Sequence, residues 1–311
     1  MKHKWGLNEG YFSEDNHDHH FFLALEKIKE LGFDGILMID PRKYSLTLSE
    51  IKKGLRDSGL SLMQLHSDYF NMADPDKEKR HQAIDFYKKR IEYALELEAE
   101  QLVIHPGGET MCFETDKEIE EGIERNAQCL KEITKEAQGA DLKIALENTD
   151  GIENRPRYLK PILAKVRGTS LETEFKRRGG MPPDYRFGSR TNHLVRVIEA
   201  VKRDSNYPNL GICLDTSHAF ATKFGLENSI FEADKYIIST HLHDTRYHNN
   251  EEHLLPGMGL IKWDEVMRAF KEIGYSGPFV FEITLLESDK KDWDEKAKLV
   301  RKSKRLLEDL L

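Results

Sequence analysis

The chain has 311 residues, of which 39% are hydrophobic and 33% are charged, and its formal net charge is −8. This composition excludes a disordered chain, and no run of about 18 apolar residues is present to cross a membrane. The acidic balance also argues against a protein whose whole surface binds nucleic acid. We expect one globular domain over residues 1–311. Because the first residues lack a signal-peptide pattern and Cys112, Cys129 and Cys213 have no paired spacing, we expect it in the cytoplasm.

Short β-rich runs alternate along the chain with longer segments of helical period. The predicted strands are Trp5–Asn8, Gly35–Ile39, Ser61–His66, Gln101–His105, Leu142–Glu147, Leu210–Asp215, Ile237–His243 and Phe279–Ile283. The predicted helices are His20–Leu31, Leu48–Ser58, Lys77–Glu98, Lys117–Gln138, Asn192–Arg203, Ile230–Ala233, Trp263–Ile273 and Trp293–Leu310. Glycines in "ELGFDG", "DSGLS" and "EIGYSG" stand where a left-handed residue ends a helix.

Eight strands that are each followed by a helix predict an α/β fold, a closed (β/α)₈ TIM barrel. A doubly wound open sheet is the alternative, although it would need an unusually large number of strands. No G-x-G-x-x-G motif follows a strand, so nothing indicates a dinucleotide site.

One connection, the segment 150–191 after the fifth strand, is far longer than an ordinary loop of this fold. Between Gly151 and Ser205 there are 13 Lys and Arg against 6 Asp and Glu, a net charge of +7 that leaves −15 for the remainder. This insertion either closes over the active site as a lid that faces an anionic ligand, or forms a solvated excursion.

Six successive predicted strands finish on or beside a histidine or an acid. These residues are His66, His105, Glu147, Asp215 with His218, His241 with His243, and Glu282. In a (β/α)₈ barrel the carboxyl ends of the strands meet at one mouth, where the active site is built. Taken singly, each residue has an ordinary explanation as a half-buried side chain or a helix cap.

Buried acids and imidazoles that converge on one opening cost several kcal/mol each, unless a cation neutralises the acids. The sequence therefore predicts a divalent metal site. Mixed histidine and carboxylate ligands without a cysteine cluster suit Zn²⁺ or Mn²⁺, with Co and Fe as further options. Glu251 and His253 lie two residues apart after the seventh strand, and we expect them to complete a second or third metal position, with a surface turn as the alternative.

The motifs at these strand ends resemble the xylose-isomerase-like TIM barrels, a superfamily that holds sugar phosphate isomerases and epimerases and the AP endonuclease family 2, endonuclease IV type. The resemblance spans nearly the whole chain outside the insertion. It is carried by "ALEKIKELGFDGI", "LHSDYFNMA", "LVIHPGG", "IALENT", "LGICLDTSHAF", "HLHD" and "HLLPGMGLIKWDEV".

In the isomerase branch, the resemblance implies one metal held by Glu147, Asp215, His241 and Glu282. Glu147 and Glu282 would also be the catalytic acid and base. The metal would chelate a substrate carbonyl and its neighbouring hydroxyl, while the glutamates move the proton of the C–H between them. We expect His218, His243 and Tyr69 to contact the substrate, and Arg186 and Arg190 to hold a phosphate or carboxylate.

In the endonuclease branch, the resemblance implies three Zn²⁺ ions shared among nine ligands. The matching positions are His66, His105, Glu147, Asp215, His218, His241, Glu251, His253 and Glu282. Glu251 stands where the nuclease pattern has Asp, which puts the third metal in doubt. Tyr69 and Phe70 follow His66 much as the DNA-intruding residues of the nucleases do.

The charge distribution decides between the branches. An enzyme that binds a DNA duplex neutralises several phosphates around its site, whereas the basic residues here concentrate in one insertion of an acidic body. We therefore predict a metal-dependent isomerase or epimerase of a sugar or sugar phosphate. The alternatives are a zinc-dependent AP endonuclease, for which nucleic acid would be the partner, and a binding protein that keeps the fold alone. The sequence predicts no membrane contact and is compatible with a homo-oligomer.

Overall fold

The structure is a computed structural model, and it describes residues 3–12, 18–108, 116–150, 187–205, 207–222, 224–246, 252–283 and 292–311. Eight parallel strands form one sheet in the order β7-β6-β5-β4-β3-β2-β1-β8. Their bounds are β1 (Trp5–Asn8), β2 (Gly35–Met38), β3 (Ser61–His66), β4 (Gln101–Ile104), β5 (Lys143–Glu147), β6 (Leu210–Asp215), β7 (Ile237–His241) and β8 (Phe279–Phe281).

The sheet closes on itself between its two outer strands. A parallel bridge joins Leu242, directly after β7, to Phe281 of β8, and the Leu242 amide donates to the Val280 carbonyl at 2.7 Å. The predicted (β/α)₈ barrel is therefore confirmed, and the open-sheet alternative is wrong.

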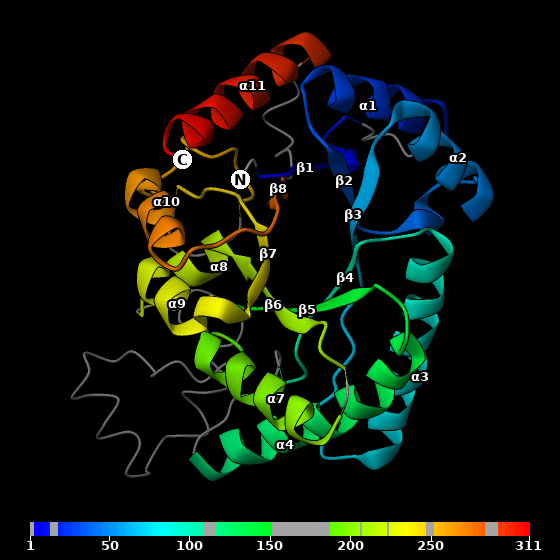
Figure 1. Cartoon of the computed structure of the whole chain (residues 1–311), viewed down its shortest axis with the longest axis vertical. Helices are drawn as coiled ribbons and strands as arrows, with labels where there is room; N and C mark the ends of the chain where they lie inside the picture. Colours follow the sequence, from blue (N-terminus) through cyan, green and yellow to red (C-terminus); the bar gives the residue numbers. More distant parts are fainter. Residues whose placement is uncertain are drawn as a thin grey trace, which may run out of the picture.

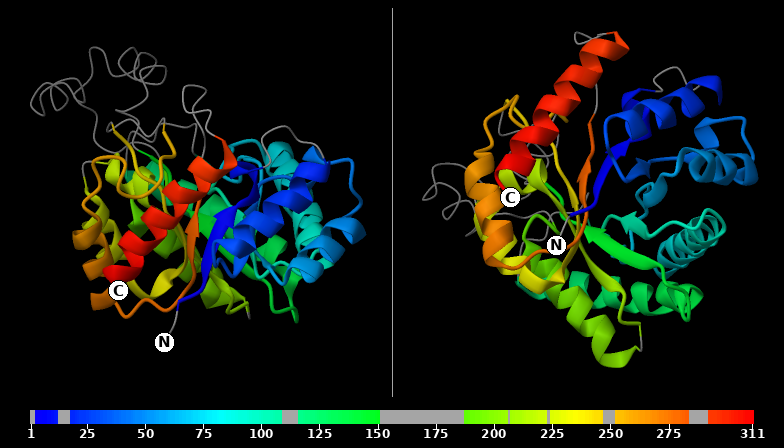
Figure 2. Two further views of the ribbon diagram at one scale, coloured as in Figure 1. Left: turned by 90° about the horizontal axis from the view of Figure 1, so that it is seen from above. Right: turned by 45° about the horizontal axis from the view of Figure 1, so that its top comes forward.

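Helices surround the strands, as Figures 1 and 2 show. The longer helices are α1 (Asp18–Glu30), α2 (Leu48–Ser58), α3 (Lys77–Glu96), α4 (Asp116–Ile133), α7 (Thr191–Asp204), α9 (Leu226–Ala233), α10 (Trp263–Glu272) and α11 (Trp293–Asp309). The five-residue α8 (Thr216–Phe220) and the 3₁₀ turns η1 (Glu9–Tyr11), η2 (Pro41–Lys43), η3 (Thr134–Ala137) and η5 (Asp234–Tyr236) complete the described elements. Within the described residues, no helix combines the length and the apolar character that a bilayer span requires.

Local sequence explains where several helices begin and end. Thr47 and Glu50 form a reciprocal capping box at the start of α2, and Asp76 and Asp292 cap α3 and α11. The glycine that follows α2, Gly59, has φ +66°, a conformation that L side chains rarely adopt. The same reasoning placed the predicted helix end at this residue.

Side chains alternate between the interior of the barrel and the surrounding helices. Leu37, Met63 and Val280 form an apolar cluster separate from the main core, while Ile36 and Met38 belong to the large core shared with the helices. A second separate cluster contains Val103, Ala145 and Cys213. The strands are thus packed on both faces, and polar side chains gather where they end.

The predicted insertion 150–191 lies outside the described residues, apart from Asp150 and 187–191. Its proposed role as a lid is therefore still a prediction. Arg186 and Glu251, both predicted at the site, also lie outside the described part of the chain.

Candidate metal centre

The predicted strand-end residues occupy the carboxyl ends of six strands. His66, Glu147, Asp215 and His241 are the last residues of β3, β5, β6 and β7. His105 and Glu282 directly follow β4 and β8. Glu147, Asp215 and His241 are at most 1% exposed, and Glu282 and His66 are also buried.

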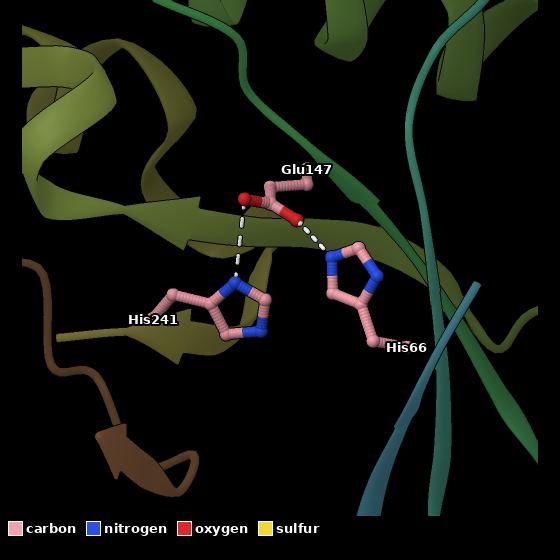
Figure 3. Close-up of side chains that lie close together, drawn as sticks. All are labelled: His66, Glu147 and His241. Carbon is pink, nitrogen blue, oxygen red and sulfur yellow. Dashed lines mark hydrogen bonds and ion pairs between the residues drawn. The ribbon is translucent and has the colours of Figure 1, made fainter. Parts of the chain in front are cut away.

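Glu147 lies at the centre of this group, with imidazoles on both of its carboxylate oxygens (Figure 3). Its Oε2 is 2.9 Å from His66 Nε2 and 3.6 Å from His105 Nε2. Its Oε1 is 3.3 Å from His241 Nδ1 and 3.4 Å from His218 Nδ1. One carboxylate therefore connects the ends of β3, β4 and β7 with the start of α8.

Four groups meet around His241. One ligand atom from each of Glu147, Asp215, His241 and Glu282 lies within 4.8 Å of the other three. His241 Nδ1 is 3.2 Å from Glu282 Oε2 and 4.0 Å from Asp215 Oδ2. We call these four residues the tetrad.

The tetrad fits a divalent cation. It places three carboxylates around one imidazole in a buried space, an excess of negative charge that a divalent cation would balance. Within the described part of the chain, neither ring nitrogen of His241 makes a hydrogen bond, although both are buried. Nitrogen and oxygen donors in this ratio are those that Zn²⁺ and Mn²⁺ accept.

The imidazoles control the charge of the acids. Burial opposes ionisation of Glu147, but His241 and His105 outweigh it and lower the pKa of this carboxyl well below its usual value. Burial likewise opposes ionisation of Glu282, and His241 again lowers the pKa of the carboxyl. Although burial disfavours its charged form, the pKa of His241 is raised well above its usual value by Cys213, Glu282 and Glu147. Both glutamates are thus carboxylates at neutral pH.

A second group lies beside the tetrad, where one ligand atom from each of His243, His253 and Glu282 lies within 4.8 Å of the other two. His243 Nε2 is 2.6 Å from Asp215 Oδ2, and the ring of His243 stacks on that of His253 with centroids 4.0 Å apart. His243 was predicted to contact substrate, and it is 0% exposed.

Side chains behind the candidate ligands fix the positions of these residues. Asn148 donates to the Asp215 carbonyl at 3.1 Å and accepts from the Asp215 amide at 2.7 Å. Asn8 makes the same pair of bonds to Ile283, which follows Glu282, at 3.0 and 2.8 Å. Asp244 accepts four bonds, from the amides of Thr245, Gly257 and Ile261 and from Trp263 Nε1. No role at the site was predicted for Asn8, Asn148 or Asp244, because in the sequence each reads as an ordinary strand-end, turn or capping residue.

Three further residues were predicted at the site. Tyr69 is half-buried and lies in the loop after β3, three residues beyond His66. His218 donates from Nδ1 to the Asn148 carbonyl at 2.8 Å, and its side chain is 10% exposed. Arg190 contacts Glu232 Oε1 at 2.6 Å and lies 3.6 Å from the centre of the Phe224 ring. The structure thus places Arg190 against α9 and its preceding loop.

Comparison with known proteins places this geometry in a family, since a family model described as xylose isomerase-like TIM barrel matches residues 25–303. The chain belongs to the xylose isomerase-like TIM barrel family. It is 28% identical over 260 residues to an uncharacterised protein of Methanocaldococcus jannaschii, which covers 82% of this chain and 76% of that protein. It is 26% identical over 263 residues to a probable endonuclease 4 of Halothermothrix orenii, covering 77% and 80% of the two chains.

Solved structures share the fold of this family member. A D-psicose 3-epimerase from Clostridium cellulolyticum in complex with D-tagatose has a TM-score of 0.72, with 18% identity and 99% of both chains covered. The IolI protein with a bound zinc atom has a TM-score of 0.73, with 21% identity and 99% of both chains covered. The comparisons therefore name enzymes of two classes, epimerases and endonucleases.

Proposed function

We propose that the protein is a divalent-metal-dependent isomerase or epimerase that acts on a small sugar or sugar phosphate. The observation that carries the proposal is the placement of two glutamates around one imidazole. Glu147 Oε1 and Glu282 Oε2 lie 3.3 and 3.2 Å from the same His241 Nδ1, although they come from the ends of β5 and β8. Two carboxylates thus border one position from different strands.

These carboxylates suit proton transfer at a carbon atom. Both are ionised at neutral pH, so either can accept a proton from a substrate C–H within reach; because the lowered pKa makes each a weak base, the C–H itself must be made more acidic. A bound cation would polarise the substrate carbonyl and hydroxyl and so make that C–H more acidic. In an isomerisation the glutamate that has taken the proton returns it to the neighbouring carbon; in an epimerisation the other glutamate first takes a proton from solvent and then delivers it to the opposite face of the carbon.

His218 supports the orientation of a sugar. Its Nδ1 is held by the Asn148 carbonyl at 2.8 Å, which assigns the proton to Nδ1 and leaves Nε2 as an acceptor for a hydroxyl. Because Asn148 also holds the backbone of Asp215, one amide aligns both the metal ligand and the substrate contact.

Arginines near the mouth favour a small substrate over a DNA duplex. Arg42 after β2 pairs with Asp40 and Asp68, Arg190 pairs with Glu232, and Arg246 after β7 pairs with Glu252. Each guanidinium is already neutralised by an acid of this chain. Binding to a duplex relies on cations that are available to phosphates.

An AP endonuclease is the second candidate. It is supported by His66 and His105, which both face Glu147 Oε2 and would give that glutamate further nitrogen partners for a second metal. The identity to a probable endonuclease 4 also favours it.

Solvent deuterium separates the two candidates. Metal-loaded protein is incubated in deuterated buffer with a panel of ketoses and sugar phosphates, and uptake of deuterium at the carbon beside the carbonyl is followed by NMR. We expect uptake with at least one sugar and none with the Glu282→Gln variant. If instead the protein incises a duplex with an abasic site and exchanges no sugar proton, the isomerase proposal is wrong and the endonuclease stands.

A further inference from the structure

Behind the end of β3, we propose that Arg90 of α3 is a positioning residue for the reaction at the barrel mouth. Its guanidinium holds the main chain of His66, and the His66 ring in turn holds the carboxylate of Glu147 (Figure 3). The inference rests on the proposed function, because Glu147 is one of the two glutamates that are proposed to move the substrate proton.

Arg90 takes the place of a strand beside His66. The ladder between β2 and β3 stops one residue before His66, which is the last residue of β3. At this point Arg90 Nη2 donates to the His66 carbonyl at 3.0 Å and to the Ile39 carbonyl, directly after β2, at 3.4 Å. On its other side His66 still pairs with Val103 of β4. The guanidinium therefore joins the ends of β2 and β3 where their ladder has stopped.

The His66 ring connects this main chain to Glu147. Its Nδ1 donates to the Ser67 carbonyl at 3.0 Å, and its Nε2 donates to Glu147 Oε2 at 2.9 Å. Both partners can only accept a hydrogen bond, so both ring nitrogens carry a proton. Although burial disfavours this charge, Glu147 raises the pKa of His66. A displacement of the β3 main chain would therefore move a charged ring that orients the Glu147 carboxylate.

The burial of Arg90 argues for a positioning role over a purely stabilising one. Its side chain is 2% exposed, and within the described part of the chain its Nε and Nη1 make no hydrogen bond. Asp40 Oδ1 lies 4.0 Å from Nη1, and it also accepts from Arg42 Nε at 2.8 Å. A buried cation with unbonded donors costs free energy, and an apolar side chain of similar volume often replaces such a cation without loss of stability. We therefore assign to Arg90 the placement of β3.

A second arginine of α3, Arg80, makes the same kind of contact away from the site. Its Nη1 donates to the Asp74 and Pro75 carbonyls at 2.7 and 3.0 Å. These two carbonyls belong to the loop that leads into α3, whereas the carbonyls bonded by Arg90 belong to the ends of two barrel strands. Arg80 is therefore the matched control, because it loses the same bonds on substitution without a connection to Glu147.

Kinetics and NMR together test the role of Arg90. We expect Arg90→Met to lower kcat of the proposed sugar reaction by about 10- to 100-fold and to leave KM within about twofold of wild type, since Arg90 acts behind the main chain. In chelator-stripped protein with isotope-labelled histidine, the Nε2–H signal of His66 should shift, because its bond to Glu147 changes. Arg90→Lys, which keeps the cation on a shorter arm, should lose less turnover. Arg80→Met should leave both readouts at wild-type values.

Urea unfolding checks that each variant is folded under the assay conditions, and Arg90→Lys carries the test if Arg90→Met does not fold. The positioning role is overturned if the folded Arg90 variants keep either the wild-type turnover or the wild-type His66 signal. The NMR signal, which is assigned by its loss in His66→Gln, does not depend on the sugar reaction. A shifted signal in Arg90→Met, when the wild type exchanges no sugar proton, keeps the placement of His66 by Arg90 and rejects the isomerase.

Discussion

Two neighbouring strands of the barrel end beside a buried glutamate, and the two carboxyls differ in charge. Glu9 directly follows β1, and Glu282 directly follows β8, which pairs with β1. Burial raises the pKa of Glu9 to about 7, although Lys43 and the Tyr44 hydroxyl act against this shift. Burial acts in the same direction on Glu282, but His241 reverses it and lowers the pKa of that carboxyl.

The difference shows that neighbouring imidazoles, and not the depth of burial, decide whether a glutamate at this mouth is ionised. The described neighbours of Glu9 include a hydroxyl, Tyr44 Oη at 3.4 Å, whereas Glu282 faces two histidine rings. The β5–β8 side of the mouth therefore holds ionised carboxylates and the candidate metal ligands, and the β1 side holds an acid that is largely protonated below neutral pH.

The largest expected effect is on turnover, when a glutamate on the β5–β8 side of the mouth loses its charge. We expect Glu147→Gln and Glu282→Gln each to reduce turnover by about 10²- to 10⁴-fold, since a glutamine accepts no proton from carbon. The rate of the proposed sugar reaction measures this loss. Glu9→Gln, the same change at the neighbouring strand end, is the control and should retain turnover. A near-normal rate in either of the first two variants would contradict the assignment of Glu147 and Glu282 as the catalytic acid and base.

An intermediate effect is expected in the pH dependence of stability. Glu9 is protonated in both states below about pH 4.5; above that, the unfolded chain ionises first, so the folded state loses stability as pH rises to about 7. With a shift of this size the loss is about 3 kcal/mol. Glu9→Gln should therefore gain about 3 kcal/mol over wild type between pH 4 and pH 8. Urea unfolding at several pH values measures it, and an unchanged difference would contradict the raised pKa.

The smallest effect is expected on the free energy of unfolding, when a neutral hydrogen bond behind the charged residues is removed. The Thr216 hydroxyl bonds the His243 carbonyl at 2.8 Å and the His243 amide at 3.1 Å. We expect Thr216→Val to lower the free energy of unfolding by about 1 to 2 kcal/mol, because a buried amide loses its acceptor. Unlike the Glu9 effect, this loss should be the same at pH 5 and pH 8. Urea unfolding at those two values is the check, and a clear slope would assign charge to this contact.

The strands were predictable because their apolar runs stop at polar residues. All eight lie where the sequence placed them, and their ends differ from the predicted ones by at most two residues. The seventh strand was expected to reach His243 but ends at His241. Beyond that point the Leu242 amide still bonds to Val280 of β8, but the backbone amides of His243 and Asp244 bond to Thr216 and Leu254. No periodicity in the sequence reports such partners.

Helices near the mouth were harder to predict. The five-residue α8 was missed because Asp215, Thr216 and Ser217 read as a cap or a loop; the Asp215 side chain does cap it, by accepting from the His218 amide. Helix α9 begins at Leu226 and not at the predicted Ile230. Its N-cap is Gly225, which has no side chain to cap the helix and so gives no signal for this start in the sequence. Short helices carry too little periodicity to be delimited.

Within the candidate site, the convergence of the strand-end acids and histidines followed from the fold, and their roles stay predictions. What the sequence did not reveal were the contacts between distant segments. Arg190 was expected to hold a substrate anion, yet its partner Glu232 lies 42 positions along the chain. Glu9 was not predicted at the site, because the residues beside it in the sequence do not indicate that its carboxyl is buried.

The side-chain amide of Asn8 makes two hydrogen bonds to the backbone of Ile283, at a sequence separation of 275. During synthesis β1 leaves the ribosome first, and it can pair with β8 only after nearly the whole chain has been made. Glu282 arrives in the same late step. The candidate site is therefore completed only when the first and last strands pair, and a product truncated before β8 lacks Glu282.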